Sequence, residues 1–278
     1  MTTSTRALNL AALSENQREL LELLRTHRFA TSRQLTRFAL PRYRSANSAH
    51  RQTLRHLAGL EEQRLVTRLE RRIGGWQRGS DVAVWSLTTT GLRLLTGSTC
   101  RQRPQAVSTT FLAHTLATTE VCLVISETVR EIDSAEVSLT QEPDCWRNFP
   151  SPAGGFVTLR PDLAATITSP EYADHYFLEV DRATENPARI IRTTRQYLAY
   201  QQTGIEQEAL GVFPAVIWIV PHAKRQIQLT RHLSAEPGVP SDLWLVITLD
   251  QLPELVRDGP EEFRAHHHQS PPMKGDSP

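Results

Sequence analysis

The sequence has only two lysines, Lys224 and Lys274, so arginine supplies almost all of its positive charge. Its three cysteines lie far apart and form no Cys-x-x-Cys pair, which argues against a zinc site and against a disulfide framework. No Gly-x-x-x-x-Gly-Lys-Ser/Thr stretch occurs, so the sequence does not indicate a nucleotide triphosphatase. The histidines are scattered apart from the run 266–268, and no three-histidine metal cluster is evident.

Long apolar runs are also lacking. The longest candidate, residues 216–220, has the length of a strand, whereas a membrane helix needs roughly 20 apolar residues. The first twenty residues do not contain the apolar core of a signal peptide. We therefore expect a cytoplasmic protein with no membrane partner.

Charge is distributed very unevenly along the chain. Residues 1–107 contain 18 arginines and seven acidic residues, a net charge of +11. Residues 108–278 contain 13 basic and 23 acidic residues, a net charge of −10. Such a division predicts two modules, the first of which faces a polyanion.

The basic part carries the signals of three helices followed by a hairpin. Ser14 and Thr31 are typical helix N-caps, Pro41 ends the second helix, and a third helix begins near Ser45. Alternating apolar residues and the glycines at 74–80 then predict two strands and a turn. The stretch LRHLAGLEEQRLV resembles the third helix and first wing strand of a winged helix-turn-helix, which we expect over residues 1–95. The apolar positions of that third helix, which we expect to face the core, are Leu54, Leu57, Leu60 and Leu65.

In a winged helix the third helix enters the major groove of duplex DNA and the wing contacts phosphates. Arginine can pair with guanine or phosphate, and asparagine with adenine. The alternative is that these side chains form a solvated face of a protein-docking module. The candidate DNA-binding residues are Asn47, Ser48, Arg51, Gln52 and Arg55 on the helix and Arg68, Arg71, Arg72 and Arg78 on the wing.

Residues 96–108 are polar, show no period and are predicted to be a linker. The second module, expected over 109–255, begins with a helix to about residue 130. Strands at about 135–140, 156–159, 163–168, 176–181 and 212–220 follow, with a helix at 187–200. This order predicts an α/β (α+β) fold in which helices flank a mixed sheet. We expect residues 256–278 to be a disordered tail.

Three carboxylates are predicted to share one face of this sheet: Asp162, Glu179 and Asp181. The order of elements and the acids of RPD and FLEVDR resemble the PD-(D/E)xK nuclease-like fold, in which acids hold Mg²⁺ or Mn²⁺ and a lysine offsets charge. Here Asp181 stands where that lysine is expected. Possible supporting residues are Glu120, Arg182, Arg192, Arg195, Gln196, Tyr200 and Lys224. Alternatively, arginines such as Arg189, Arg192 and Arg195 neutralise the acids and the domain is not catalytic.

The stretches FLAHTLATTEVCLVI, LRPDLAATI and YFLEVDRATENPARIIRTTRQYLAYQ, together with the winged helix, resemble the replication-relaxation family of plasmids and integrative elements. The resemblance covers about residues 14–220 and implies a role in replication or transfer, with a relaxase or replication protein as a possible partner. We expect a DNA-binding accessory protein, with a homodimer as one possible assembly. The alternatives are a metal-dependent nuclease or nickase that uses Asp162 and Glu179, and a winged-helix transcriptional regulator.

Overall fold

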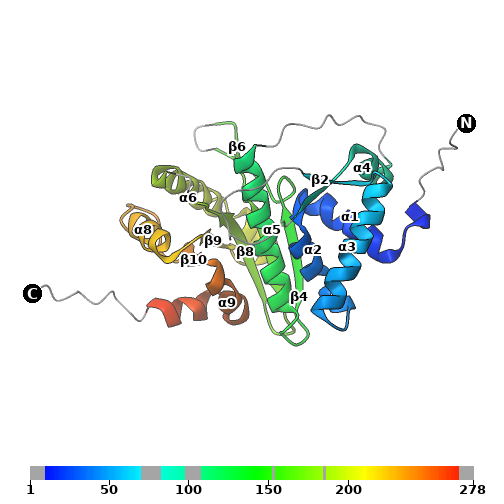
Figure 1. The fold of residues 1–278 in the computed structure, drawn as a ribbon. Coiled ribbons are helices and arrows are strands. Elements are labelled where there is room, and N and C mark those ends of the chain that lie inside the picture. The colour runs from blue at the N-terminus through cyan, green and yellow to red at the C-terminus, as the bar shows by residue number, and fades with distance from the viewer. Residues whose placement is uncertain (1–9, 70–82, 98–107, 152–153, 184–185, 269–278) are drawn as a thin grey trace, which may run out of the picture. The chain divides into compact units, whose positions relative to one another are not determined.

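The computed structural model describes residues 10–69, 83–97, 108–151, 154–183 and 186–268 (Figure 1). It divides the chain into two compact units, Met1–Leu123 and Val124–Pro278. Helices and strands are mixed, and helices flank a mixed sheet, which confirms the predicted α/β class. The predicted linker and the turn at 74–80 fall almost entirely outside the described residues.

The N-terminal unit contains helices whose starts were readable from the sequence. Ser14 and Thr31 each form a capping box with the glutamine three residues later. Ser45 and Thr88 accept hydrogen bonds from backbone N–H groups in the first turns that follow them. The helices are η1 (Leu10–Ala12), α1 (Glu15–His27), α2 (Ser32–Ala39), η2 (Leu40–Arg42), α3 (Ala46–Glu62) and α4 (Thr89–Thr96).

A small antiparallel sheet completes this unit. Its strand order is β1–β3–β2, formed by β1 (Ala30–Thr31), β3 (Val84–Leu87) and β2 (Val66–Leu69). Trp85 of β3 is buried, and its indole N–H donates to the Ser32 hydroxyl at 2.8 Å. Helices α1 to α4 and the sheet thus enclose one apolar core, which includes Leu21, Leu24 and Leu57.

The buried side of α3 differs from the prediction at one position. Ala49, Thr53, Leu57 and Leu60 are buried, whereas Leu54 is 38% exposed. Positions 49, 53, 57 and 60 follow the helical spacing of three and four residues, and position 54 lies outside that stripe. Leu54 therefore belongs to the outer face of α3.

Helix α5 (Thr109–Val129) crosses the boundary between the two units. In the N-terminal unit, Leu112 packs with Phe29 and Val84, and Leu116 lies against this cluster. By length and composition, α5 is the one described helix that could cross a membrane, with a mean hydropathy of 1.2 over the best 18-residue window. Since 44% of that window is buried and the core helix of a soluble protein meets the same criteria, localisation stays a prediction.

The C-terminal unit is built on a five-stranded sheet of order β10–β9–β8–β7–β4. Strands β8, β9 and β10 are parallel to one another, and β7 is antiparallel to both β8 and β4. The bounds are β4 (Glu136–Gln141), β7 (Leu163–Thr168), β8 (Ala173–Val180), β9 (Ala215–Val220) and β10 (Trp244–Thr248). The expected strand at 156–159 is β6 (Phe156–Leu159), which pairs with β5 (Arg147–Pro150) in a separate hairpin.

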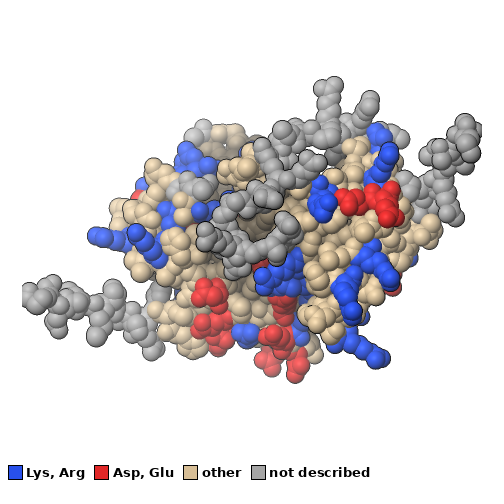
Figure 2. Space-filling view, in the orientation of Figure 1, with Lys and Arg blue, Asp and Glu red and all other residues tan. Residues whose placement is uncertain are grey.

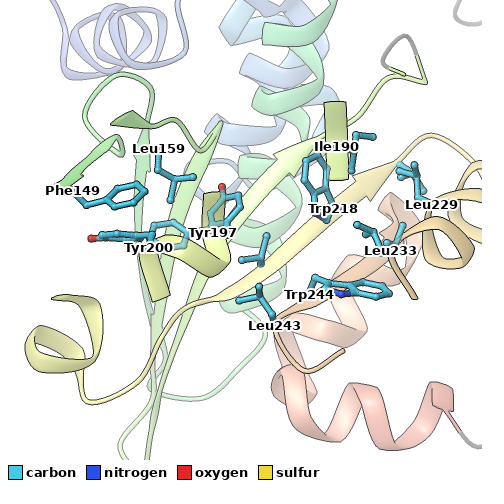
Figure 3. Close-up of a cluster of buried hydrophobic side chains, with 14 residues drawn as sticks. Phe149, Leu159, Ile190, Tyr197, Tyr200, Trp218, Leu229, Leu233, Leu243 and Trp244 are labelled. Carbon is cyan, nitrogen blue, oxygen red and sulfur yellow. The ribbon is translucent and has the colours of Figure 1, made fainter. Parts of the chain in front are cut away.

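Two crossover helices cover one face of this sheet. Helix α6 (Pro187–Gln201) connects β8 to β9 through the short α7 (Ile205–Leu210), and α8 (Ala223–Ser234) connects β9 to β10. Figure 3 shows Trp218 and Trp244 of the sheet among apolar side chains from α6 and α8. This buried cluster holds both helices against β8, β9 and β10.

The predicted disordered tail is wrong as far as His268. After η3 (Leu249–Gln251), residues Leu252–His268 form α9, which has a kink at Gly259 (φ 77°) before Pro260. Val256 and Phe263 are buried, and they provide apolar anchoring that a solvated tail would lack. Gly259 lies close to Asp174 of β8, because a Cβ at this position would be 3.2 Å from Asp174 Oδ2.

Candidate functional site

The outer face of α3 presents a stripe of polar side chains. Asn47, Arg51 and Arg55 are four residues apart and exposed, so they lie on one side of the helix. Ser48 and Gln52 are half-buried beside them. Acidic residues occur in α3 only at its last two positions, 61 and 62. The stripe is therefore positive and contains donors for oxygen and nitrogen acceptors.

The residues predicted to form a wing are only partly described. Arg68 on β2 is exposed, while Arg71, Arg72 and Arg78 lie outside the described residues. Sequence reasoning missed Arg44 and Arg64, which flank α3 and are also exposed. Each arginine lies next to one end of α3, the helix predicted to enter the major groove, and this position could have identified them from the sequence.

Glu120 belongs to this unit and serves a bridging role there. Its carboxylate accepts a hydrogen bond from Gln34 Nε2 at 2.9 Å and forms an ion pair with Arg37. Gln34 and Arg37 are in α2, so Glu120 joins α5 to the helix that precedes α3.

In the C-terminal unit, the three predicted acids lie on the sheet face that α6 and α8 cover. Ala164 is opposite Phe177 in the β7–β8 register, which places Asp162 beside Glu179. Glu179 is opposite Trp218 of β9, and Asp181 follows directly after β8. Glu179 and Asp181 are 8% and 6% exposed.

Asp181 is held by an arginine that sequence reasoning did not select. Arg225 Nε donates to Asp181 Oδ2 at 2.6 Å, and its Nη2 donates to Oδ1 at 3.3 Å. The backbone N–H of Ala183 also donates to Asp181 Oδ1, at 3.1 Å. Arg225 is in the first turn of α8, and its backbone N–H donates to His222 Nδ1. The fork of a guanidinium thus satisfies both oxygens of Asp181.

The other two acids also accept hydrogen bonds. Tyr197 Oη donates to Glu179 Oε1 at 2.6 Å, and the backbone N–H of Val180 donates to Asp162 Oδ2 at 2.8 Å. Burial raises the pKa of Tyr197 well above its usual value, and the charges of Glu179 and Asp162 add to this rise. This shift favours the protonated phenol, which is the form that donates to Glu179.

The supporting residues are dispersed around this cluster. Arg195 forms an ion pair with Glu236, and Tyr200 Oη donates to Glu206 Oε1 at 2.9 Å. Gln196 is half-buried on α6. Arg182, Arg192 and Lys224 are exposed, whereas Arg225, the next residue after Lys224, is buried.

This arrangement does not match a site in which all three acids bind one Mg²⁺ or Mn²⁺ ion. Ligand oxygens of such an ion lie about 2.0–2.1 Å from it in an octahedron, and hence close to one another. Within the described ranges, one group of three His, Cys, Asp or Glu residues has its ligand atoms within 4.8 Å of one another, and it consists of Glu254, Asp258 and His266 on α9. Asp162, Glu179 and Asp181 do not form such a group. The Asp181 carboxylate already has a cation, Arg225, beside it.

A model of the replication-relaxation family matches residues 21–216, which is more than half of the chain. The matched segment extends from the middle of α1 to the start of β9, and it contains α3, Glu179 and Asp181. Arg225 lies beyond it. No curated protein matches the chain.

Proposed function

The chain belongs to the replication-relaxation family, and we propose that it is a duplex-DNA-binding accessory protein of plasmid or mobile-element replication. The family membership supports the replication-related role. The proposed DNA contact rests on one observation, the exposed stripe of Asn47, Arg51 and Arg55 on α3. In this proposal the N-terminal unit is a winged helix and α3 enters the major groove.

The chemistry of the stripe fits base edges. Arg51 and Arg55 carry planar guanidinium groups that pair with guanine O6 and N7, and the Asn47 amide pairs with adenine N6 and N7. Leu54 lies on the same outer face and offers an apolar contact to a thymine methyl group. Exposed Arg44, Arg64 and Arg68 surround these residues and suit contacts with phosphates.

The C-terminal unit acts as a scaffold in this proposal. Arg225 neutralises Asp181, Tyr197 donates to Glu179, and Asp162 caps the Val180 N–H, so each acid stabilises the fold locally. A metal-dependent nuclease needs carboxylates that are open to the ion, with a positively charged side chain beside them. The three acids Asp162, Glu179 and Asp181 do not form such a site.

The DNA contact is tested by a gel-shift titration of the full chain. The probes are duplexes from the origin region of the encoding element and random duplexes of equal length. The Arg51→Ala/Arg55→Ala variant should lose about 1–3 kcal/mol of binding free energy per arginine for the origin duplex, and less for the random one. Arg18→Ala/Arg25→Ala, which removes the same charge from α1, is the matched control. Equal affinities of the wild type and the α3 variant would contradict the proposal.

The scaffold role is tested separately with supercoiled plasmid in Mg²⁺ or Mn²⁺. The wild type, Asp162→Ala and Glu179→Ala should give equal amounts of nicked product, at the background level. Metal-dependent nicking by the wild type that either substitution abolishes would replace the scaffold role with a nuclease.

A further inference from the structure

The two helices that cover the C-terminal sheet carry basic residues but no acidic ones. Helix α6 has three arginines, and α8 has one lysine and two arginines. This composition stands out because acidic residues outnumber basic ones by 23 to 13 over residues 108–278. Figure 2 shows the blue side chains over α6 and α8, whereas red side chains gather near α9.

Within the described residues, ion pairs are formed by Arg225 and Arg195. Arg225 is buried against Asp181, and Arg195 pairs with Glu236. Arg192, Lys224 and Arg231 are exposed, and among the described residues no carboxylate forms an ion pair with them. The charged groups of these three side chains are therefore accessible to a ligand from solution.

The topology brings the first turns of both helices, and with α8 the exposed Lys224, to one edge of the sheet, while Arg231 lies in the last turn of α8. Helices α6 and α8 follow the parallel strands β8 and β9, so both helices begin at the carboxyl edge of the sheet. They pack side by side on the same face through Ile190 and Leu229 (Figures 1 and 3). Arg182, exposed two residues after β8, lies at the same edge. The positive ends of the two helix dipoles also point to this edge, which favours an anion there.

We propose that the outer faces of α6 and α8 form a second DNA-contact surface, which binds the phosphate backbone of duplex DNA without reading its sequence. This inference rests on the proposed function, because it assigns the same ligand to both units. Exposed arginine and lysine on the faces of two adjacent helices suit a row of phosphates. Neither helix contains an acidic residue that would weaken this attraction.

The number of phosphates contacted can be measured from the salt dependence of binding. For duplex DNA, the slope of log K against log salt concentration falls by about 0.9 for each lost contact. The full-chain variant Arg192→Ala/Lys224→Ala should therefore show a slope smaller by about 2, equally for origin and random duplexes. Both substituted side chains are exposed, so its melting temperature should equal that of the wild type.

Arg130→Ala/Arg257→Ala is the matched control, because it removes two exposed cations of the same unit that lie outside α6 and α8. A slope equal to that of the wild type in the α6/α8 variant, or an equal reduction in the control, overturns the inference. A loss of binding to phosphatidylserine vesicles without any change in DNA binding overturns it in favour of a lipid surface.

The same titrations distinguish this inference from the proposed function. If Arg51→Ala/Arg55→Ala weakens origin binding and Arg192→Ala/Lys224→Ala changes nothing, only the second surface is wrong. If the α3 variant binds like the wild type while the α6/α8 variant loses its salt slope, the N-terminal contact is wrong and the second surface stands.

Discussion

Asp181 and Arg225 form an ion pair whose side chains are 1% and 6% exposed, so water hydrates neither charge after folding. Taking two charges out of water costs several kcal/mol per ion, and a bidentate geometry with further hydrogen bonds is needed to offset that cost. The Ala183 N–H donates to Asp181, and Arg225 Nη1 donates to the side-chain amide oxygen Oε1 of Gln228, which supplies these further bonds. Removal of one partner should therefore destabilise the protein by more than the intact pair contributes to its net stability.

We expect Arg225→Met to lower the free energy of unfolding by about 3–5 kcal/mol, because it leaves the Asp181 carboxylate buried without its cation. Asp181→Leu/Arg225→Met should recover much of that loss, since both charges are then gone. Chemical denaturation of the two variants measures the difference. Arg195→Met is the control: its pair with Glu236 is 61% exposed at the arginine and should contribute about 1 kcal/mol or less. A double variant no more stable than Arg225→Met would contradict this account.

His27 makes the N-terminal unit sensitive to acid. Burial lowers the pKa of His27 from 6.5 to about 4, and its ring stacks on Phe38 at 5.0 Å. Between these two pKa values the unfolded chain binds a proton that the folded chain does not, so stability is present above pH 6.5 and lost as the pH falls toward 4. Over this range His27 should lower the free energy of unfolding by about 1.4 kcal/mol for each pH unit, and His27→Phe should abolish that decrease. Urea denaturation from pH 7 to 4 tests it, and exposed His50→Gln should behave like the wild type.

The residues of the acid cluster were only partly predictable. Asp162, Glu179 and Asp181 follow from strand periodicity, because alternate residues project to one face. Arg225 is 44 positions from Asp181, and only the crossover of β9 and α8 brings them together. Tyr197 was not selected from the sequence; the candidate was Tyr200, one turn further on, which contacts Glu206 instead.

At the scale of elements, Gly91 fixes the contact of α4 with Leu65, the residue that precedes β2. A Cβ on Gly91 would lie 2.1 Å from the Leu65 carbonyl oxygen. Gly91→Ala should therefore reduce stability by about 1–3 kcal/mol through overpacking. Gly59→Ala is a matched control within α3, where the nearest atom is Gln17 Nε2 at 3.5 Å. It should stabilise the helix by up to about 1 kcal/mol. Thermal unfolding should give shifts of opposite sign, and equal shifts would refute the packing argument.

Helix starts were the most predictable elements because their signals are local. The caps at Ser14, Thr31 and Ser45 each depend on residues within three positions. Helix α9 was not predicted, since its apolar anchors are interrupted by the Gly259–Pro260 kink and resemble a solvated tail. Leu54 was misplaced because a leucine was assumed to be buried, while the actual stripe uses the smaller Ala49 and Thr53.

At the scale of the whole molecule, the boundary between units depends on packing that no local signal reveals. Residues 96–108 have the composition of a linker, yet the compact units divide within α5, after Leu123. The first half of α5 groups with the N-terminal unit, where Leu112 and Leu116 pack and Glu120 binds α2. Hydrophobic periodicity identifies such a helix but does not say which neighbour covers it.

Duplex DNA should stabilise the whole chain if both proposed surfaces bind it. A ligand that binds only the folded state at about 100 times its Kd raises stability by about 2.7 kcal/mol. We expect a higher melting temperature with origin duplex at 50 mM salt and a smaller increase at 500 mM salt, where phosphate contacts weaken. A shift that does not depend on salt would contradict binding through phosphates. Arg51→Ala/Arg55→Ala should show a smaller shift than the wild type at equal DNA concentration.

The Asp181–Arg225 pair also restricts which sequences can descend from this one. A mutation that introduced lysine at position 181 would place two cations together in a buried site, and loss of Arg225 alone would leave an uncompensated carboxylate. Each single step passes through a less stable protein, so the two positions can change safely only together. A sequence with the nuclease-type lysine at position 181 differs from this one by a single residue. That single substitution should nevertheless lower the stability of the protein unless position 225 changes with it.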